Sequence, residues 1–246
     1  MNKIGNTILV TGGGSGIGAA LAHEWHAAGN QLIIAGRRQA ALDAVAADHP
    51  GMAAITIDME DAGGIAQFAA TLVDRFPALN VVVHNAGIMA AEDRIDLPTA
   101  EATIATNLLG PIRLTHALLP HLLAQPRATL MTVSSGLAFV PMAATPTYSA
   151  TKAAIHSWSL SLREQLRGTS VEVIELAPPG VQTDLMPGHA DNPQMMPLDA
   201  FIVEVMDLLA QEPPLREICV DRVKILRDAE RRGEFDQVFA MINQAR

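Results

Sequence analysis

The sequence predicts an α/β fold, a single-domain Rossmann-like doubly wound parallel sheet flanked by helices on both faces. Short β-prone segments alternate with helical patterns along most of the chain, which is the order that repeated βα units produce. Right-handed crossovers between such units make the strands parallel. Residues 81–83 are all valine, as expected of a parallel strand that is covered on both faces.

The composition favours one domain, residues 1–246. The chain is 49% hydrophobic and 17% charged and contains no Pro/Ser-rich linker, low-complexity run or internal repeat. The net charge of −9 and the pI near 5.3 argue against nucleic acid and anionic membrane partners. No apolar stretch approaches the ~20 residues that span a bilayer. The single cysteine, Cys219, allows no internal disulfide, and no signal peptide precedes the first strand. We therefore expect a cytoplasmic protein.

The first predicted βα unit carries a glycine-rich turn. Residues 7–10 form its strand and residues 19–28 its helix, which Gly29 ends. Glycine permits a tight turn and lets the backbone approach a pyrophosphate, which the helix N-terminus attracts. An ordinary strand-to-helix loop is the alternative, and the G-x-x-x-G-x-G spacing differs from the usual dinucleotide motif G-x-G-x-x-G. The candidate phosphate contacts are Gly12, Gly14, Ser15, Gly16, Ile17 and Gly18.

Two arginines follow the second predicted strand, residues 31–35. In a fold of this kind the second strand ends beside the adenosine ribose, where an acid suits NAD and an arginine suits the 2′-phosphate of NADP. Here Arg37 and Arg38 occupy that place and no acid does. We therefore favour NADP(H) over NAD(H), with Arg37 the better candidate. The alternative for Arg38 is the start of a solvated helix.

Other polar residues fall at the ends of later strands. A strand at residues 53–57 leads into Asp58 and Met59, where the carboxylate either accepts from an adenine amino group or caps a helix starting near Asp61. The strand at residues 81–83 leads into His84, Asn85, Ala86 and Gly87, and a strand at 128–133 leads into Ser134 and Ser135. Ligands bind beyond the carboxyl ends of the strands in doubly wound sheets, so these residues are expected to meet at one site.

Tyr148 and Lys152 are the candidate residues for proton transfer at this site. Tyr148 is the only tyrosine in the chain and stands four residues before Lys152, at the start of a helical pattern over residues 149–167. An i, i+4 pair shares one helix face. A nearby ammonium group stabilises a phenolate and lowers the tyrosine pKa from ~10 towards a range useful for proton transfer. The alternative is an ordinary exposed pair.

Taken together these motifs resemble the short-chain dehydrogenase/reductase family, and within its single-domain branch they are similar to the DltE-like subgroup. The motifs are the turn at residues 11–18, Asn85-Ala-Gly87, Asn107, the serine pair and Tyr148-x-x-x-Lys152, and for the subgroup residues 5–13, 175–185 and 217–243. The resemblance implies an NAD(P)(H)-dependent oxidoreductase that forms a homodimer or homotetramer. It implies a catalytic tetrad of Asn107, Ser135, Tyr148 and Lys152, with further cofactor contacts at Asp58, Met59, Asn85, Ala86, Gly87, Pro178, Val181 and Thr183. His84 departs from the asparagine that many members carry.

The expected reaction is hydride transfer between NADP(H) and a small-molecule carbonyl or alcohol, with Tyr148 as general acid/base. The resemblance implies that Ser135 donates a hydrogen bond to the substrate oxygen and that Lys152 holds the nicotinamide ribose. It also implies that Asn107 interrupts a helix and holds a water. The apolar stretches 137–142 and 185–196 favour a fairly apolar substrate, under a substrate loop at about residues 184–200. The helical tail at about 221–246 either packs back on the domain or reaches a partner. A non-catalytic NADP(H)-binding regulator is the alternative function, and no metal site is expected.

Overall fold

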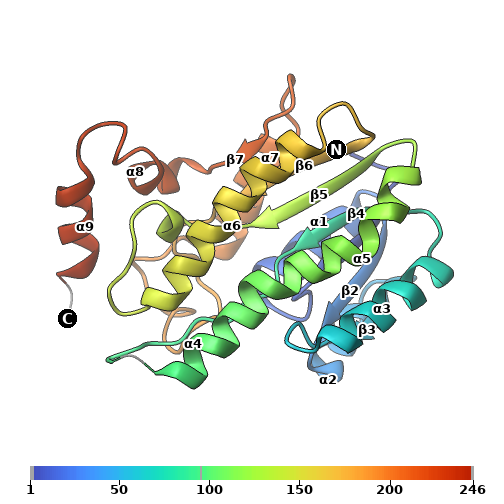
Figure 1. Cartoon of the computed structure of the whole chain (residues 1–246), viewed down its shortest axis with the longest axis horizontal. Coiled ribbons are helices and arrows are strands. Elements are labelled where there is room, and N and C mark those ends of the chain that lie inside the picture. The colour runs from blue at the N-terminus through green and yellow to red at the C-terminus, as the bar shows by residue number, and fades with distance from the viewer. Residues whose placement is uncertain (1–2, 95, 245–246) are drawn as a thin grey trace.

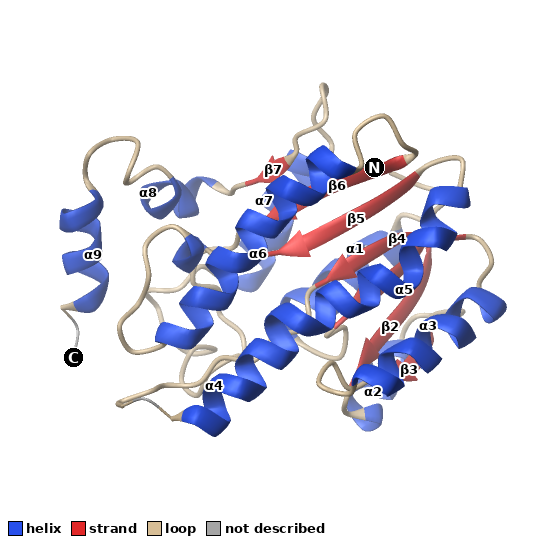
Figure 2. Ribbon diagram, viewed as in Figure 1, coloured by secondary structure: helices blue, strands red, loops and turns tan. Residues whose placement is uncertain are grey.

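A seven-stranded parallel sheet forms the centre of the computed structural model, which describes residues 3–94 and 96–244. The strand order is β3-β2-β1-β4-β5-β6-β7, and every neighbouring pair is parallel (Figure 2). The strands are β1 Thr7–Thr11, β2 Gln31–Gly36, β3 Ala53–Thr56, β4 Leu79–His84, β5 Ala128–Val133, β6 Val171–Leu176 and β7 Glu217–Ile218. The predicted doubly wound sheet is confirmed.

Helices cover both faces of this sheet (Figure 1). On one face lie α3 Ala62–Arg75, α5 Gly110–Ala124 and α6 Pro146–Gln165, and on the other α1 Gly16–Ala27, α2 Gln39–Ala47 and α7 Leu198–Leu209. Helix α4 Leu97–Ile104 packs against α6. The short helices α8 Lys224–Arg227 and α9 Phe235–Asn243 follow β7. Within the described residues, every helix falls short of the length and apolarity that crossing a bilayer requires.

Alternating residues of the strands build two separate apolar cores. Ile8 and Val10 of β1 pack with Trp25 of α1, whereas Leu9 between them packs with Leu114 of α5. The same alternation continues along the sheet because successive strand side chains point to opposite faces. Both faces are therefore apolar, which is why the central strands are continuous hydrophobic runs.

The predicted elements match the structure closely in the middle of the chain and less well at its C-terminal end. The strands at 128–133 and 171–176 coincide with β5 and β6. Helix α1 begins at Gly16, so the last three residues of the glycine turn form its first turn. The loop expected at about 184–200 ends earlier because α7 begins at Leu198, and neither α7 nor β7 was predicted. Residues 245 and 246 of the predicted tail lie outside the described residues.

A π-helical turn joins α4 to α5. The sequence predicted helices at 99–109 and 112–123, but the structure has one helical run in which Ala105–Leu109 form the π turn. Such a turn adds a residue to the helix and is frequent at functional sites. Here it carries Asn107, whose side chain is buried.

The glycine turn is packed tightly against the end of β4. A Cβ on Gly18 would lie 2.4 Å from Asn85 Nδ2 and 2.5 Å from the Gly12 carbonyl oxygen. A Cβ on Gly14 in the same turn would meet its nearest atoms at 3.4 Å, which is close to ordinary contact. The close approach of α1 to the sheet therefore requires glycine at position 18.

Gly18→Ala is expected to destabilise the fold by roughly 1–3 kcal/mol, because the added methyl forces the helix away from backbone atoms that cannot give way. Gly14→Ala is the matched control and is expected to cost far less. Urea unfolding of both variants measures the difference. Equal losses of stability would contradict this account of Gly18.

Candidate active site

A cleft of about 890 Å³ lies at the carboxyl ends of the strands, where the sequence placed a ligand site. Nearly all the predicted cofactor contacts line it, namely Gly12, Gly14, Ser15, Gly16, Ile17, Arg37, Arg38, Asp58, Met59, Asn85, Ala86, Gly87, Pro178, Val181 and Thr183. Three members of the predicted tetrad, Ser135, Tyr148 and Lys152, line it as well. Gly18 and Asn107 stand behind its wall instead, and both are buried.

The glycine turn has the shape of an anion cradle. Gly12 and Gly16 have φ values of +69° and +52°, which L side chains rarely adopt. A Cβ on Gly12 would lie 2.8 Å from the Ala86 Cα, so the two loops nearly touch. Ser15, the N-cap residue of α1, makes no capping hydrogen bond with its side chain. The first N–H groups of α1 thus face the cleft without a side-chain cap, and they suit a pyrophosphate.

Asn85 holds this turn in place. Its Nδ2 donates to the carbonyl oxygens of Thr11 at 3.0 Å and Gly12 at 3.3 Å. The Thr11 hydroxyl accepts from the backbone N–H groups of Asn85 and Ala86, both at 3.1 Å, and donates to the Val83 carbonyl. These bonds tie the ends of β1 and β4 together. The Asn85 side chain therefore shapes the cradle, and Asn85 also lines the cleft.

The two predicted arginines differ in what they contact. Arg37 is half exposed, and its Nη1 lies 3.6 Å from Glu60 Oε1, a pairing that the sequence did not predict. Arg38 is the N-cap of α2 and exposed, as the solvated-helix alternative expects. Asp58 accepts from the Glu60 N–H at 3.0 Å, so its carboxylate forms a local turn rather than a helix cap.

Ser135, Tyr148 and Lys152 meet at the deep end of the cleft. Ser135 is close enough to the Tyr148 hydroxyl to lower its pKa by hydrogen bonding, and its Oγ accepts from the Leu137 N–H at 3.1 Å. Lys152 Nζ lies 5.4 Å from the centre of the Tyr148 ring. Lys152 Nζ donates to the Val133 carbonyl oxygen, at the end of β5, at 2.8 Å. Ser134 turns the other way and donates to the Leu176 carbonyl oxygen at 3.4 Å. The serine at position 135 is therefore the one beside the tyrosine.

Burial controls the ionisation of this pair. It raises the pKa of Tyr148 to about 12, an effect that the Ser135 hydrogen bond only partly opposes. It lowers the pKa of Lys152 to about 8. The sequence led us to expect a lowered tyrosine pKa, and in this structure that expectation is wrong. The cost of removing the phenolate from water outweighs the stabilisation that Ser135 provides.

Asn107 acts on the cleft through the loop after β4. Its Oδ1 accepts from the Ile88 N–H at 2.8 Å, while Nδ2 donates to the Ile88 carbonyl at 2.9 Å and to Thr151 Oγ1 at 3.3 Å. A Cβ on Gly87 would lie 3.3 Å from Asn107 Oδ1 and 3.8 Å from Lys152 Nζ. The π turn thus aims the amide at the loop that passes Lys152.

The C-terminal tail supplies cleft residues that sequence reasoning missed. Leu226, just after the start of α8, and Ile242, near the end of α9, line the same cleft as Tyr148. The tail therefore packs back on its own chain, which is one of the two possibilities that the sequence left open. From the stretches expected to form a substrate pocket, the lining residues are Leu137, Met142, Leu185, His189, Asn192, Gln194 and Met195.

Two groups of polar side chains that include histidines lie outside this cleft, and of these the described structure offers the second as a possible metal site. In the first group, His23 and His26 lie on α1. The structure brings His49 beside them, with its Nε2 2.7 Å from His23 Nδ1. The second group is His156, Glu175 and Glu217, whose ligand atoms lie within 4.8 Å of one another.

The chain is similar over nearly its whole length to a protein that is named an oxidoreductase. A model of the family described as short chain dehydrogenase matches residues 6–194. A Bacillus subtilis (strain 168) protein named uncharacterized oxidoreductase DltE is 38% identical over 251 residues, covering 99% of this chain and 98% of the relative. This similarity agrees with the subgroup that the sequence motifs indicated, and it extends through the C-terminal tail.

Solved structures share the fold. A short-chain dehydrogenase from Streptomyces avermitilis has a TM-score of 0.81 and 26% identity, over 97% of this chain and 96% of its own. Another from Burkholderia cenocepacia J2315, solved in complex with NADP, has a TM-score of 0.82 and 21% identity, over 98% of this chain and 99% of its own. Both therefore have this arrangement of sheet and helices.

Replacing Lys152 with methionine is expected to stabilise the protein at neutral pH. The folded pKa is lowered from 10.5 to about 8, so burial of the cation destabilises the native state fully below pH 8. That penalty is relieved as the pH rises from 8 to 10.5, because there the unfolded chain binds more protons than the native one. A shift of this size corresponds to roughly 3 kcal/mol at most.

The melting temperature of Lys152→Met should therefore exceed that of the wild type at pH 7, and the gap should narrow towards pH 10.5. Lys224→Met is the control, since Lys224 is half exposed and pairs only with Asp221 in the same turn. An advantage of Lys152→Met that does not change with pH would contradict the buried-cation account.

Proposed function

The chain belongs to the short-chain dehydrogenase family and is an NAD(P)-dependent oxidoreductase, and from this premise we propose that it interconverts a carbonyl and an alcohol with NADP(H). One observation carries the proposal. Tyr148, beside Ser135 and Lys152, lies in the same cleft as a glycine turn with an uncapped helix N-terminus. A proton donor and a pyrophosphate cradle in one cleft suit hydride transfer to a carbonyl.

The nicotinamide cofactor supplies or accepts the hydride when it is bound, and the side chains handle the proton. We assign Tyr148 as the group that protonates the substrate oxygen during reduction and removes that proton during oxidation. Its raised pKa means that the hydroxyl is protonated at neutral pH, as reduction requires. Ser135 donates to the same oxygen while it gains charge.

Lys152 and Asn107 assist the proton transfer by Tyr148. Lys152 has three N–H donors, of which one bonds to Val133. The other two are available for ribose hydroxyls, and its charge favours the Tyr148 phenolate during oxidation. Asn107 keeps the loop at Ile88 in place beside Lys152 through the paired bonds described above.

Preference for NADP(H) rests on Arg37 and is opposed by Glu60. A 2′-phosphate beside Arg37 would gain a charge-assisted contact. Glu60, 3.6 Å from that guanidinium, would have to give up its pairing or repel the phosphate. The preference for NADP(H) over NAD(H) is therefore proposed to be moderate in size, and Glu60 is proposed to limit it.

The substrate is proposed to be uncharged and fairly apolar. Leu137, Met142, Met195, Leu226 and Ile242 line the cleft together, beside Asp184 and His189. The apolar side chains outnumber these two ionisable ones, which favours a mainly apolar substrate. We also propose assembly into a homodimer or homotetramer. Exposed apolar side chains on the helices of one face are available to such an interface, namely Ile104, Leu109, Leu123 and Leu160.

Tyr148→Phe is expected to lower kcat for NADPH-dependent carbonyl reduction by about 10²–10⁴-fold, because it removes only the proton donor. The loss of absorbance at 340 nm over a panel of ketones, aldehydes and diketones measures the rate. NADPH affinity, followed by fluorescence, should remain near that of the wild type and serves as the control. Wild-type protein that binds NADPH but reduces nothing in the panel would instead favour a non-catalytic regulator.

Two substitutions at the ribose end should shift coenzyme affinity in opposite directions. Arg37→Ala is expected to raise the Kd of NADPH about tenfold, the loss of one charge-assisted contact, and to leave that of NADH nearly unchanged. Glu60→Gln should lower the Kd of NADPH by freeing Arg37. Arg38→Ala is the control. NADPH binding to Arg37→Ala as tight as to the wild type would show that the 2′-phosphate site lies elsewhere.

A further inference from the structure

Two glutamates stand side by side on the last two strands of the sheet. Glu175 of β6 and Glu217 of β7 are partners in the parallel register, so their side chains leave the same face of the sheet. Glu175 is 0% exposed and Glu217 is partly buried. Like charges on adjacent strands are destabilising, and a buried carboxylate is costly unless it is paired. The fold must therefore bring counter-groups to both.

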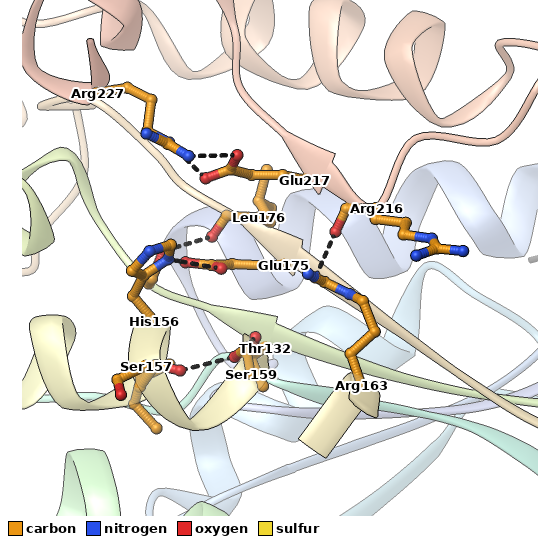
Figure 3. A network of polar contacts seen from close by, with 12 residues as sticks. Thr132, His156, Ser157, Ser159, Arg163, Glu175, Leu176, Arg216, Glu217 and Arg227 are labelled. Carbon is orange, nitrogen blue, oxygen red and sulfur yellow. Dashed lines mark hydrogen bonds and ion pairs between the residues drawn. The ribbon is translucent and has the colours of Figure 1, made fainter. Parts of the chain in front are cut away.

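These counter-groups come from two distant parts of the chain, the catalytic helix and the tail (Figure 3). His156 on α6 lies one turn beyond Lys152, and its Nδ1 contacts both Glu175 oxygens at 2.9 and 3.0 Å. Arg227 at the end of α8 donates from Nε and Nη2 to the two Glu217 oxygens at 2.6 and 3.0 Å. A two-bond pairing of this kind is strong and directional.

Phe139 closes the gap between the two pairs. Its ring meets the His156 ring edge to face with centres 4.8 Å apart, and the Arg227 guanidinium lies 4.6 Å from its centre. Phe139 follows the short 3-10 turn Gly136–Ala138 that begins after Ser135. We call His156, Glu175, Glu217, Arg227 and Phe139 the clamp. It joins α6, β6, β7, α8 and the turn after Ser135.

The clamp holds Leu226 against the active site. A Cβ on Gly136 would lie 2.6 Å from Leu226 Cδ1 and 2.9 Å from Val223 Cγ2, so the tail packs directly on the turn that follows Ser135. Leu226 precedes Arg227 and lines the cleft. Without the Arg227 pairing, α8 is a four-residue helix, too short to be stable by itself.

A second anchor acts at the far end of the tail. Asn243, the last residue of α9, accepts from the Ala143 N–H at 2.6 Å and donates to the Pro141 carbonyl at 3.2 Å. Ile242 beside it lines the cleft, as does Met142 between the two anchored residues. Figure 1 shows α8 and α9 beyond the arrowhead of β5. The tail thus covers part of the cleft with two apolar side chains, Leu226 and Ile242, each next to a residue that is anchored by polar contacts.

We propose that Arg227 is a positioning residue that holds Leu226 as a wall of the substrate pocket, and that Leu226 and Ile242 thereby select the apolar group of the substrate. The inference rests on the proposed function, because it assigns part of a carbonyl or alcohol substrate to these side chains. It gives the clamp a role that the family motifs do not include.

A metal ion is the rival explanation of the clamp, since His156, Glu175 and Glu217 could hold one. Arg227 already occupies both Glu217 oxygens and supplies a positive charge. A divalent cation would have to displace it, and the released guanidinium would lose its pairing in a partly buried place. The geometry therefore favours a clamp without metal.

A double-mutant cycle tests whether Arg227 acts through Leu226. With octanal as substrate, Leu226→Ala and Arg227→Gln are each expected to raise KM about tenfold, because an apolar contact is lost or displaced. The double variant should be no worse than Leu226→Ala alone, since residues acting as one unit are not additive. The KM for acetaldehyde, which is too short to reach the tail, and the KM for NADPH should change less than about twofold.

Arg231→Gln is the matched control, because Arg231 lies on the same segment and pairs on the surface with Asp228. Additive effects of Leu226→Ala and Arg227→Gln, or equal effects on octanal and acetaldehyde, would overturn the inference while leaving the proposed function intact. A wild type that reduces no carbonyl would instead overturn the proposed function.

Amide hydrogen exchange decides the matter without turnover. In Arg227→Gln, residues 221–227 and the turn at 136–139 should exchange at least about tenfold faster, with β5 unchanged. Unchanged exchange in the tail would refute the clamp. Zinc or manganese that raises the melting temperature of the wild type but not of Glu175→Gln would also refute it, by showing a metal site.

Discussion

The buried ammonium of Lys152 is the constraint on which the site depends. A cation that is only 5% exposed requires a partner, and the Val133 carbonyl at the end of β5 is one. That bond is possible only where α6 crosses the carboxyl end of β5. The helix must therefore lie where its first turns reach both the strand end and the cleft, and Tyr148, one turn earlier, is placed by the same requirement.

The position of α6 is secured along its length by groups that do not touch the cleft. At its start, the Glu92 carboxylate accepts from the Thr147 N–H at 3.1 Å and from its hydroxyl at 2.9 Å, so an acid from the loop after β4 caps the helix. In its middle, His156 is bonded to Glu175. Towards its end, Arg163 donates to the Val173 and Arg216 carbonyls. Helix α6 is therefore joined to β6 and to the segment entering β7, and a shift of Lys152 would strain all three contacts.

Local patterns in the sequence predicted the sheet, the glycine turn and the Tyr148–Lys152 pair, because each depends on residues close together in the chain. Strand composition, a Gly-rich turn before a helix, and an i, i+4 spacing are all visible within about 20 residues. The raised pKa of Tyr148 was not visible, since it depends on how deeply neighbouring elements bury the hydroxyl. The pairing of Arg37 with Glu60 also escaped notice. It needs the ends of β2 and β3 to be adjacent, which the sheet order alone decides.

The C-terminal tail shows more strongly that local sequence patterns miss contacts between residues far apart in the chain. The sequence indicated that the helical tail at about 221–246 either packs back on the domain or reaches a partner, but it did not show that Glu217 and Arg227 are partly buried and paired with each other. What makes them a pair is the register of β7 against β6, which puts Glu217 beside Glu175. A two-residue strand carries almost no pattern of its own, so no reading of the chain could find that register. The same helix that carries Tyr148 and Lys152 also presents His156 to this register, four residues further along. One face of α6 therefore contacts both the cleft and the tail that covers it. A displacement of the tail would shift α6, and a displacement of α6 would alter the cleft.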